Sequence, residues 1–491
     1  MLPLSMADHY PPPPVGVTVP APRADFIGDC RYSGRHKNKP RLVQREKRVS
    51  LHEPGLAHRK QLLRGIGLAG AAIVVLNGVI GAGIFALPAE IAARAGPLSP
   101  WLFLIVGLLA ITIVLTLAEL SSYFKDSGGP FLFTSTAFGP LVGFSTGWLL
   151  FISRMQAFAA NATVMPVYLG GIWPWFGAGV GRALIIIVVC GALTWANYVG
   201  VKEGVRTMAV ITVLKITPIV LLIALGLQHV SGDTLFPAVV PAIDDIGGTT
   251  LLLIYAFVGF ESVTIVSGET QNPKSTMPRA LVRTVIGIGA LYFLIVLVYI
   301  SVLPDAGAEG ATLSDVGRVL MGPAGAIMLT FAAFFSIGGN LSSIMLAVPR
   351  LPFAMAEDRL LPRWFSEVHD RYATPSNSVM FLGGLGLVFA LSGSFVWLAV
   401  ASSLTRLISY IMCILALPVI RRKASTEERA EAYRLKGGYT VPLVALLVCA
   451  WIGAQSSLRS WIVTGILLAV GLALYALAAQ RRARWAARNR D

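Results

Sequence analysis

The chain has 491 residues, of which 55% are hydrophobic and 13% are charged, and its mean hydropathy is +0.71. A soluble protein of this length needs far more charge to cover its surface. Apolar stretches of 18 or more residues recur along the chain and predict many membrane crossings. The net charge of +15 is concentrated in the termini and short loops, which is typical of cytoplasmic loops and argues against a nucleic-acid-binding surface.

The N-terminal stretch, residues 1–64, is proline-rich and then basic, and it has no apolar periodicity. It lacks the basic, apolar and small-residue regions that make up a signal peptide. We therefore expect a disordered cytoplasmic tail.

The remainder predicts an all-α membrane protein with about twelve transmembrane helices. The expected spans are 67–93, 101–124, 140–168, 182–200, 207–228, 249–270, 280–303, 324–350, 377–394, 396–420, 440–457 and 460–479. Residues 352–374 predict an amphipathic connector on the membrane surface.

The predicted loops differ in charge. The loop after the tenth span, RRKASTEERAEAYRLKGG, holds six Arg or Lys residues, whereas the loop between the fifth and sixth spans holds none. Positively charged loops stay in the cytoplasm, so we expect both termini there and a location in the inner or plasma membrane.

Two spans carry residues that interrupt helices. The first contains GVIGAGIFALP at 78–88, and the sixth contains Gly259 in mid-span, followed by the ionisable Glu261. One glycine cluster is commonly a helix-packing feature, but two at matched positions favour a pair of broken helices around a transporter site. Because the two lie five spans apart, the second half must enter the membrane upside down, as a five-plus-five inverted repeat.

An unwound turn inside a bilayer must line a cavity, because its N–H and C=O groups have no partners in hydrocarbon. A helix N-terminus offers N–H groups to an anion, and a helix C-terminus offers carbonyls to a cation. A zwitterionic amino acid fits such a site, and the small residues 81–83 would let it approach the backbone.

Five segments in order resemble the amino acid–polyamine–organocation family of secondary transporters. They are GVIGAGIFALP at 78–88, LAELSSYFKDSGGPFLF at 117–133, NYVGVKEG at 197–204, YAFVGFESVTIVSGETQNPKSTMPRAL at 255–281 and PRLPFAMAEDRLLPRWFSEVHDRYATP at 349–375. The resemblance implies an inverted-repeat core over 65–420 that works by alternating access, with repeats at 65–230 and 247–420. Residues 421–491 would then add two further helices and a basic tail.

The resemblance also implies which residues bind substrate. Amides of the first break would receive the substrate carboxylate, and carbonyls from both breaks would receive its amino group. The amides are those of Gly81, Ala82 and Gly83, and the carbonyls are those of Val79, Tyr255 and Val258. Phe257 and Gly259 complete the expected substrate-binding set. The Tyr255 ring is expected to close over the substrate, although an ordinary membrane tyrosine is the alternative.

Lys215 lies within the fifth span, where a charged side chain usually faces the bundle interior. In similar permeases a lysine here stands in for a sodium ion, bridging first-span carbonyls and hydroxyls of the eighth span. The candidate hydroxyls are those of Ser336, Ser342 and Ser343. This implies sodium-independent transport, with proton coupling through the lysine. The alternative is a lysine that reaches the membrane interface.

Three further ionisable residues, Glu119, Arg154 and Glu261, fall at membrane depth. By the resemblance, Glu119 and Glu261 organise gating near the cytoplasmic side. Arg154 either pairs with one of these glutamates or recognises an acidic substrate side chain, and pairing is the more common role of such a residue.

The sequence argues against other classes of membrane protein. The six histidines lie in tails or loops, and HExxH is absent, so we expect no enzyme. The cysteines are far apart, so we expect no disulfide, metal or cofactor, and we expect those in the spans to be buried. They are Cys30, Cys190, Cys413 and Cys449. A channel would need repeated filter loops or rings of charge.

The sequence therefore predicts a secondary transporter that moves amino acids by alternating access, with the lipid bilayer and protons as its other partners. An amino acid or amine exchanger, or a nutrient sensor of the same fold that does not transport, remains an alternative.

Overall fold

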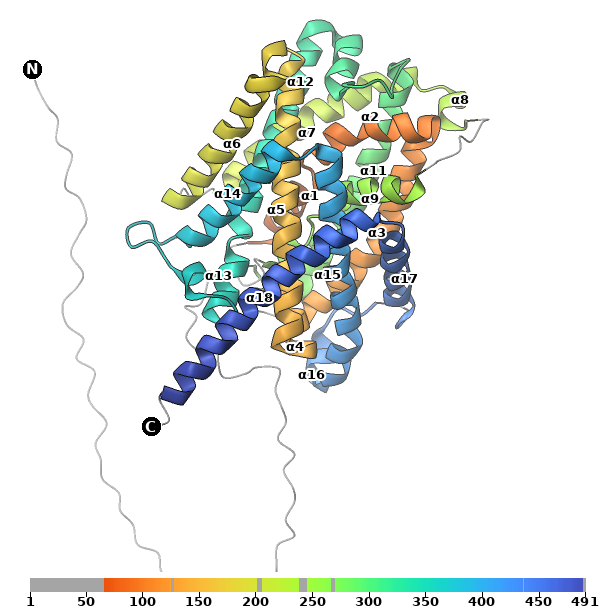
Figure 1. Cartoon of the computed structure of the whole chain (residues 1–491). Coiled ribbons are helices and arrows are strands. Elements are labelled where there is room, and N and C mark those ends of the chain that lie inside the picture. Colours follow the sequence, from red (N-terminus) through yellow and green to blue (C-terminus); the bar gives the residue numbers. More distant parts are fainter. Residues whose placement is uncertain are drawn as a thin grey trace, which may run out of the picture. The chain divides into compact units, whose positions relative to one another are not determined.

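The computed structural model describes residues 66–124, 128–200, 205–237, 245–265, 270–435 and 437–488. These residues form helices joined by short turns, and one isolated β-bridge pairs Ile66 with Thr270. The predicted all-α class is confirmed (Figure 1). The predicted N-terminal tail and the end of the basic C-terminal tail lie outside the described residues.

Much of the helical surface is apolar. Seven helical stretches in the described part of the chain are long and apolar enough to cross a membrane, and four shorter apolar helices accompany them. Val180 and Trp195 on α6 (Gly179–Val199) and Val213 on α7 (Val205–Gly226) expose more than half of their surface. Such faces are unfavourable in water and fit a hydrocarbon surround, as expected of a multi-pass membrane protein.

The helices of the first half follow the predicted spans closely. In addition to α6 and α7 they are α1 (Leu68–Val79), α2 (Gly83–Ala95), α3 (Ser99–Ser122), α4 (Pro130–Phe138) and α5 (Pro140–Gly170). The sequence prediction did not include α4. It begins at a proline, and so does α5, because proline has no amide hydrogen and tolerates the first helical turn.

The second half runs from α8 (Gly232–Leu235) to α15. It comprises α9 (Ile246–Phe257), α10 (Ser262–Ile265), α11 (Pro273–Val302), α12 (Leu313–Ala347), α13 (Arg350–Glu357), α14 (Ser376–Ser392) and α15 (Phe395–Lys423). The predicted start of the eighth span at 324 falls directly after a kink at Gly322, where the backbone leaves the helical conformation (φ 67°, ψ −158°). The helical residues before the kink begin at Leu313, where Thr312 and Asp315 form a capping box, and the sequence prediction did not include this first part.

Three helices follow the tenth span: α16 (Thr426–Glu431), α17 (Thr440–Ala454) and α18 (Leu458–Arg488). The α17 helix packs against α3 and α15, and α18 packs against α5 and α15. The indole N–H of Trp148 on α5 donates to the Leu467 carbonyl of α18 at 2.9 Å. These two long helices thus lie against the outside of the core helices.

Helix α5 positions the site. It is buried along most of its length and contacts α4, α6, α12, α14 and α15. The same packing occurs twice between the halves, with the roles of the halves exchanged. Helix α5 of the first half packs on α15 of the second, and α12 of the second half packs on α7 of the first. Likewise, α1 packs on α11, and α9 packs on α3. Helices of the two halves therefore interlock around the broken helices.

Candidate functional site

The first and sixth spans are both interrupted, as the sequence predicts. Helix α1 ends at Val79, Ile80 is extended (φ −78°, ψ 93°), and α2 begins at Gly83. Helix α9 ends at Phe257, Val258 is extended (φ −83°, ψ 160°), and Gly259 adopts φ +113°. Each break leaves backbone polar groups without their helical partners.

The two breaks touch each other through glycines. A Cβ placed on Gly259 would lie 2.1 Å from the Gly78 carbonyl oxygen, and one placed on Gly78 would lie 2.6 Å from the Gly259 carbonyl oxygen. Neither position has room for a side chain, and the positive φ of Gly259 also disfavours one. This contact explains why both breaks carry glycine.

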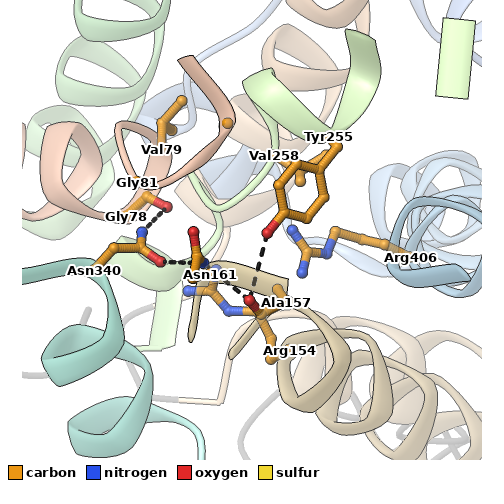
Figure 2. A pocket seen from close by; sticks show the side chains of 11 residues that line it. Gly78, Val79, Gly81, Arg154, Ala157, Asn161, Tyr255, Val258, Asn340 and Arg406 are labelled. Carbon is orange, nitrogen blue, oxygen red and sulfur yellow. Dashed lines mark hydrogen bonds between the residues drawn. The ribbon is translucent and has the colours of Figure 1, made fainter. Parts of the chain in front are cut away.

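A small cavity lies between the two breaks. Figure 2 shows its lining from both breaks and from α5, α12 and α15. The lining residues are Gly78, Val79, Gly81, Gly83, Arg154, Ala157, Asn161, Tyr255, Val258, Asn340 and Arg406. Five predicted substrate-binding residues are therefore brought together around one space.

Backbone N–H donors and backbone carbonyl acceptors both belong to residues that line this cavity. Among the described residues we find no acceptor for the N–H groups of Gly81 and Gly83. Likewise, the carbonyls of Val79, Tyr255 and Val258 receive no hydrogen bond from any described residue. Donors and acceptors that have no partner among the described residues thus surround one space.

The prediction of three free amides is wrong for Ala82. Its N–H donates to Asn161 Oδ1 on α5 at 2.7 Å. Asn161 in turn donates to Asn340 Oδ1 on α12 at 2.9 Å, and Asn340 Nδ2 donates to the carbonyls of Asn77 and Gly78 at 2.8 and 2.9 Å. A chain of two amide side chains therefore holds the first break from α5 and α12.

Lys215 faces the interior rather than the membrane interface. It is fully buried, and its Nζ donates to the Ile80 carbonyl at 3.0 Å. Ser336 Oγ donates to the carbonyls of Ile80 and Gly81 at 3.2 and 3.3 Å. The ammonium and this hydroxyl therefore meet at the first break.

The other two candidate serines are not brought to this point. Ser343 Oγ donates to the Gly339 carbonyl of its own helix at 2.9 Å. For Ser342 we find no side-chain bond to the first break among the described residues. Ser336 alone of the three predicted hydroxyls contacts first-break carbonyls.

Two arginines lie beside one glutamate at the second break. Arg154 Nε is 3.8 Å from Glu261 Oε1, and Arg406 Nε is 3.7 Å from the same oxygen. All three side chains are at least 98% buried. Arg154 thus both pairs with a glutamate and lines the cavity.

Closer hydrogen bonds fix each member of this cluster. Glu261 Oε2 accepts from the Gly259 N–H at 3.1 Å and from the Tyr410 hydroxyl at 2.8 Å. Arg154 Nη2 donates to Ser262 Oγ, and Arg406 Nε donates to Ser153 Oγ at 2.8 Å. Glu261 is therefore built into the second break itself.

Glu119 lies outside the cavity. Arg421 donates to its two carboxylate oxygens at 2.8 and 2.7 Å, and the Leu435 N–H donates to it at 3.0 Å. Arg421 also donates to the Gly438 carbonyl at 3.0 Å. Glu119 thus connects α3 to the segment between α15 and α17.

The aromatic residues of the sixth span take different positions. The Tyr255 ring lines the cavity, and its hydroxyl donates to the Ala157 carbonyl of α5 at 3.4 Å. Phe257, in contrast, packs on Tyr292 with ring centroids 5.4 Å apart and is absent from the cavity lining. Its predicted place in the substrate-binding set is not supported by this packing.

Three polar lining side chains were absent from the sequence prediction: Asn161, Asn340 and Arg406. Each is a polar residue inside an apolar span, and such residues usually face the bundle interior. The rule that selected Arg154 applies equally to Arg406. Nothing in the sequence, however, indicates that the two asparagines contact each other.

The described residues contain no group of three or more His, Cys, Asp or Glu side chains that could hold a metal ion. Cys190, Cys413 and Cys449 are buried and unpaired, as the sequence predicts for cysteines inside spans. The polar chemistry of the cavity is that of backbone groups, amides, a phenol and guanidinium groups.

Comparisons with known proteins agree with this geometry. The chain is similar to the serine/threonine exchanger SteT of Bacillus subtilis (strain 168), with 30% identity over 84% of this chain and 95% of that one. It is also similar to the branched-chain amino acid permease BcaP (26% identity, 87% and 95% coverage) and to the methylthioribose transporter (27%, 85% and 94%) of the same organism.

Among solved structures, the crystal structure of MhsT in complex with L-phenylalanine matches with a TM-score of 0.58. The match covers 81% of this chain and all of that one at 17% identity, which shows a shared fold. The family described as "Amino acid permease" matches residues 66–480, from the start of α1 almost to the end of α18. The broken helices, the cavity between them and this match together show that the chain belongs to the amino acid permease family.

Proposed function

We propose that this protein is a secondary transporter that carries amino acids across a cell membrane by alternating access. The observation that carries the proposal is the set of free backbone groups at the two breaks. The amides of Gly81 and Gly83 fit an α-carboxylate at the N-terminus of α2, where the helix dipole favours negative charge. The carbonyls of Val79, Tyr255 and Val258 fit an α-ammonium group.

Lys215 supports sodium-independent transport. Its ammonium group occupies the position beside the Ile80 carbonyl where a cation would otherwise neutralise the first break. An ammonium has three donors, and we find one acceptor for Lys215 among the described residues. A buried lysine held this loosely can exchange its proton when the cavity opens to water, so we propose proton-coupled uptake.

The exchanged packing pairs support the expected inverted repeat at 65–230 and 247–420. The contact between α5 and α15 corresponds to the contact between α12 and α7 in the other half. Such a repeat allows one half to rock against the other around the fixed site. We propose that the termini are cytoplasmic in the cell membrane, as the loop charges predict, and that 421–491 is peripheral to the transport core.

Exchange of amino acids is the second candidate, because SteT, at 30% identity, is described as an exchanger. Uptake of labelled amino acids into proteoliposomes separates the two mechanisms. Symport requires uptake that increases with an inward proton gradient and ignores sodium. Exchange requires uptake only into liposomes preloaded with amino acid.

Two outcomes would contradict the proposal. Uptake that depends on sodium would refute the role of Lys215. The absence of both uptake and binding for every amino acid would refute amino acid transport itself. Protein-free liposomes and a Gly384→Ala variant serve as controls, because a Cβ on Gly384 of α14 meets open space.

A further inference from the structure

The charges around the cavity do not balance. Arg154 and Arg406 share the single carboxylate of Glu261, and guanidinium groups stay charged in proteins. The nearby Lys215 ammonium faces a carbonyl rather than an acid. A zwitterionic amino acid has no net charge, so its binding would leave the excess positive charge in place.

Arg154 Nε lacks a hydrogen-bond partner among the described residues, but it lies 3.8 Å from Glu261 Oε1. Arg406 is the arginine with an unused terminal nitrogen. It is 99% buried, and its Nη2 has no hydrogen-bond partner among the described residues. Its Nε is held by Ser153 on α5, and the packing of α15 against α5 fixes the direction of the side chain. A buried guanidinium nitrogen without a partner is costly, and an arriving acceptor would remove this cost.

The geometry distinguishes Arg406 from Arg154. Arg154 donates through Nη2 to Ser262 and is thereby tied to the second break. A Cβ on Gly259 would lie only 3.2 Å from Arg154 Nη1, so this guanidinium is packed against the break's backbone. Arg406 also lines the cavity, but its hydrogen bond goes to Ser153 on α5 and not to a residue of either break.

Figure 2 shows the Arg406 guanidinium beside the Tyr255 ring, on the opposite side of the view from Gly78 and Gly81. A substrate whose α-carboxylate lies at the first break would therefore extend its side chain in the direction of Arg406. Arginine is well suited to this end of the site, because its planar fork binds a carboxylate through two parallel hydrogen bonds.

We propose, on the basis of the proposed function, that the preferred substrates are amino acids with an acidic side chain, and that Arg406 binds this second carboxylate. Arg406 is thus a specificity-determining residue. The occupant brings one net negative charge to a cluster with an excess of positive charge, and it supplies the acceptor that Arg406 Nη2 lacks.

The test compares isosteric acidic and neutral ligands on the purified full-length protein. Glutamate and glutamine, and aspartate and asparagine, are added at matched concentrations with and without chloride, and thermal unfolding is followed. A ligand that binds the folded state raises the unfolding temperature, so no labelled substrate is needed. The wild type is expected to bind the acids about ten- to hundredfold more tightly than the amides.

The variants make the result specific to Arg406. Arg406→Gln should lose or reverse the preference for the acid while retaining binding of the amide, and Arg406→Lys should retain part of it. Reversal is a readout that a merely structural role would not produce. Arg283→Gln changes an exposed arginine of α11 and should leave the preference unchanged.

Three results would overturn the proposal. Wild-type protein that binds glutamine as tightly as glutamate would refute it, and so would an Arg406→Gln variant that keeps the wild-type preference. Binding of neutral amino acids that requires chloride would show that an inorganic ion neutralises the cluster. In each case the proposed transport of amino acids would stand, whereas no shift with any amino acid would refute both.

Discussion

The two helix breaks differ in what holds them. Side chains from three neighbouring helices hold the first break: Asn161 on α5, Lys215 on α7, and Ser336 and Asn340 on α12. Together they form hydrogen bonds with the Ala82 amide and with four carbonyls, those of Asn77, Gly78, Ile80 and Gly81. The unwound turn is thereby fixed from outside.

The second break is held largely by its own residues. The Gly259 N–H donates to Glu261 two residues later, and the Gly259 carbonyl accepts from the N–H and the hydroxyl of Ser262. Outside contacts come from Arg154 and from Tyr410, so they involve the charged cluster.

This difference suggests a division of labour between the breaks. A turn braced by neutral amides and by Lys215 on three helices will keep its shape when substrate arrives. A turn whose capping depends on a carboxylate shared between two arginines will respond to any new charge in the cavity. We therefore infer that the first break keeps its conformation when substrate binds and that the second break changes its conformation.

The largest expected effect comes from removing the contact between the breaks. Gly259→Ala places a methyl group 2.1 Å from the Gly78 carbonyl oxygen, on a residue with φ +113°. The breaks must then separate, and we expect uptake to fall by ~100-fold or more, since displacements of about 1 Å in a site have effects of this size.

Uptake by Gly259→Ala proteoliposomes, compared with Gly384→Ala, measures this effect. Equal protein incorporation must be shown first, because a misfolded variant would also be inactive. If Gly259→Ala transported at the wild-type rate, the close approach of the two breaks would have no functional meaning.

A smaller effect is expected at Lys215. Lys215→Met keeps the volume of the side chain but removes the ammonium, while Ser336 still donates to the Ile80 carbonyl at 3.2 Å. The fold should survive, and uptake should fall about tenfold because the first break loses its only cation among the described residues. The response to a proton gradient should disappear.

Lys274→Met is the matched control, because Lys274 pairs with the exposed Glu431 at 2.7 Å. Exposed pairs contribute little, so its uptake should remain within about twofold of the wild type. Proton-driven uptake that persists in Lys215→Met would show that another group couples transport to protons.

Asn340→Ala tests whether the first break is braced from outside. The change removes two hydrogen bonds to carbonyls of α1 and the acceptor for Asn161, and each buried group left unpaired costs about 1–3 kcal/mol. We expect a lower unfolding temperature together with weaker substrate binding. Ser262→Ala at the second break removes two hydrogen bonds, one to the Gly259 carbonyl and one from Arg154 Nη2. It should destabilise less, because Asn340→Ala removes three and because the Gly259 carbonyl keeps the Ser262 N–H.

Thermal unfolding of both variants, with and without amino acid, checks this ranking. Greater destabilisation by Ser262→Ala than by Asn340→Ala would reverse the assignment of fixed and moving breaks.

The sequence predicts the framework well because its signals are local. Apolar length locates the spans, and glycines locate both breaks to within a few residues. The carbonyls of Val79, Tyr255 and Val258 accept no hydrogen bond from a described residue, and the family resemblance together with the break positions indicates the same three groups. The part of α12 before the kink at Gly322 was not predicted, because it lies outside the apolar run that marks a span.

The side-chain network could not be predicted in the same way. Asn161 and Asn340 lie 179 residues apart, and their hydrogen bond depends on how α5 packs against α12. The amide of Ala82 was expected to be free because nothing near it in the sequence shows that Asn161 reaches it. Long-range pairing of polar groups follows from packing, which no local pattern encodes.

The smallest expected effect separates the serines of α12. Ser336 donates to two carbonyls of the first break at 3.2 and 3.3 Å, whereas Ser343 donates to Gly339 within its own helix. Ser336→Ala should reduce uptake about fivefold, the equivalent of ~1 kcal/mol for one long hydrogen bond, and Ser343→Ala should have almost no effect. Since Lys215 still holds the Ile80 carbonyl in Ser336→Ala, the double variant with Lys215→Met should lose more than the product of the single losses. Simple multiplication of the two losses would mean that the hydroxyl and the ammonium act on the first break independently.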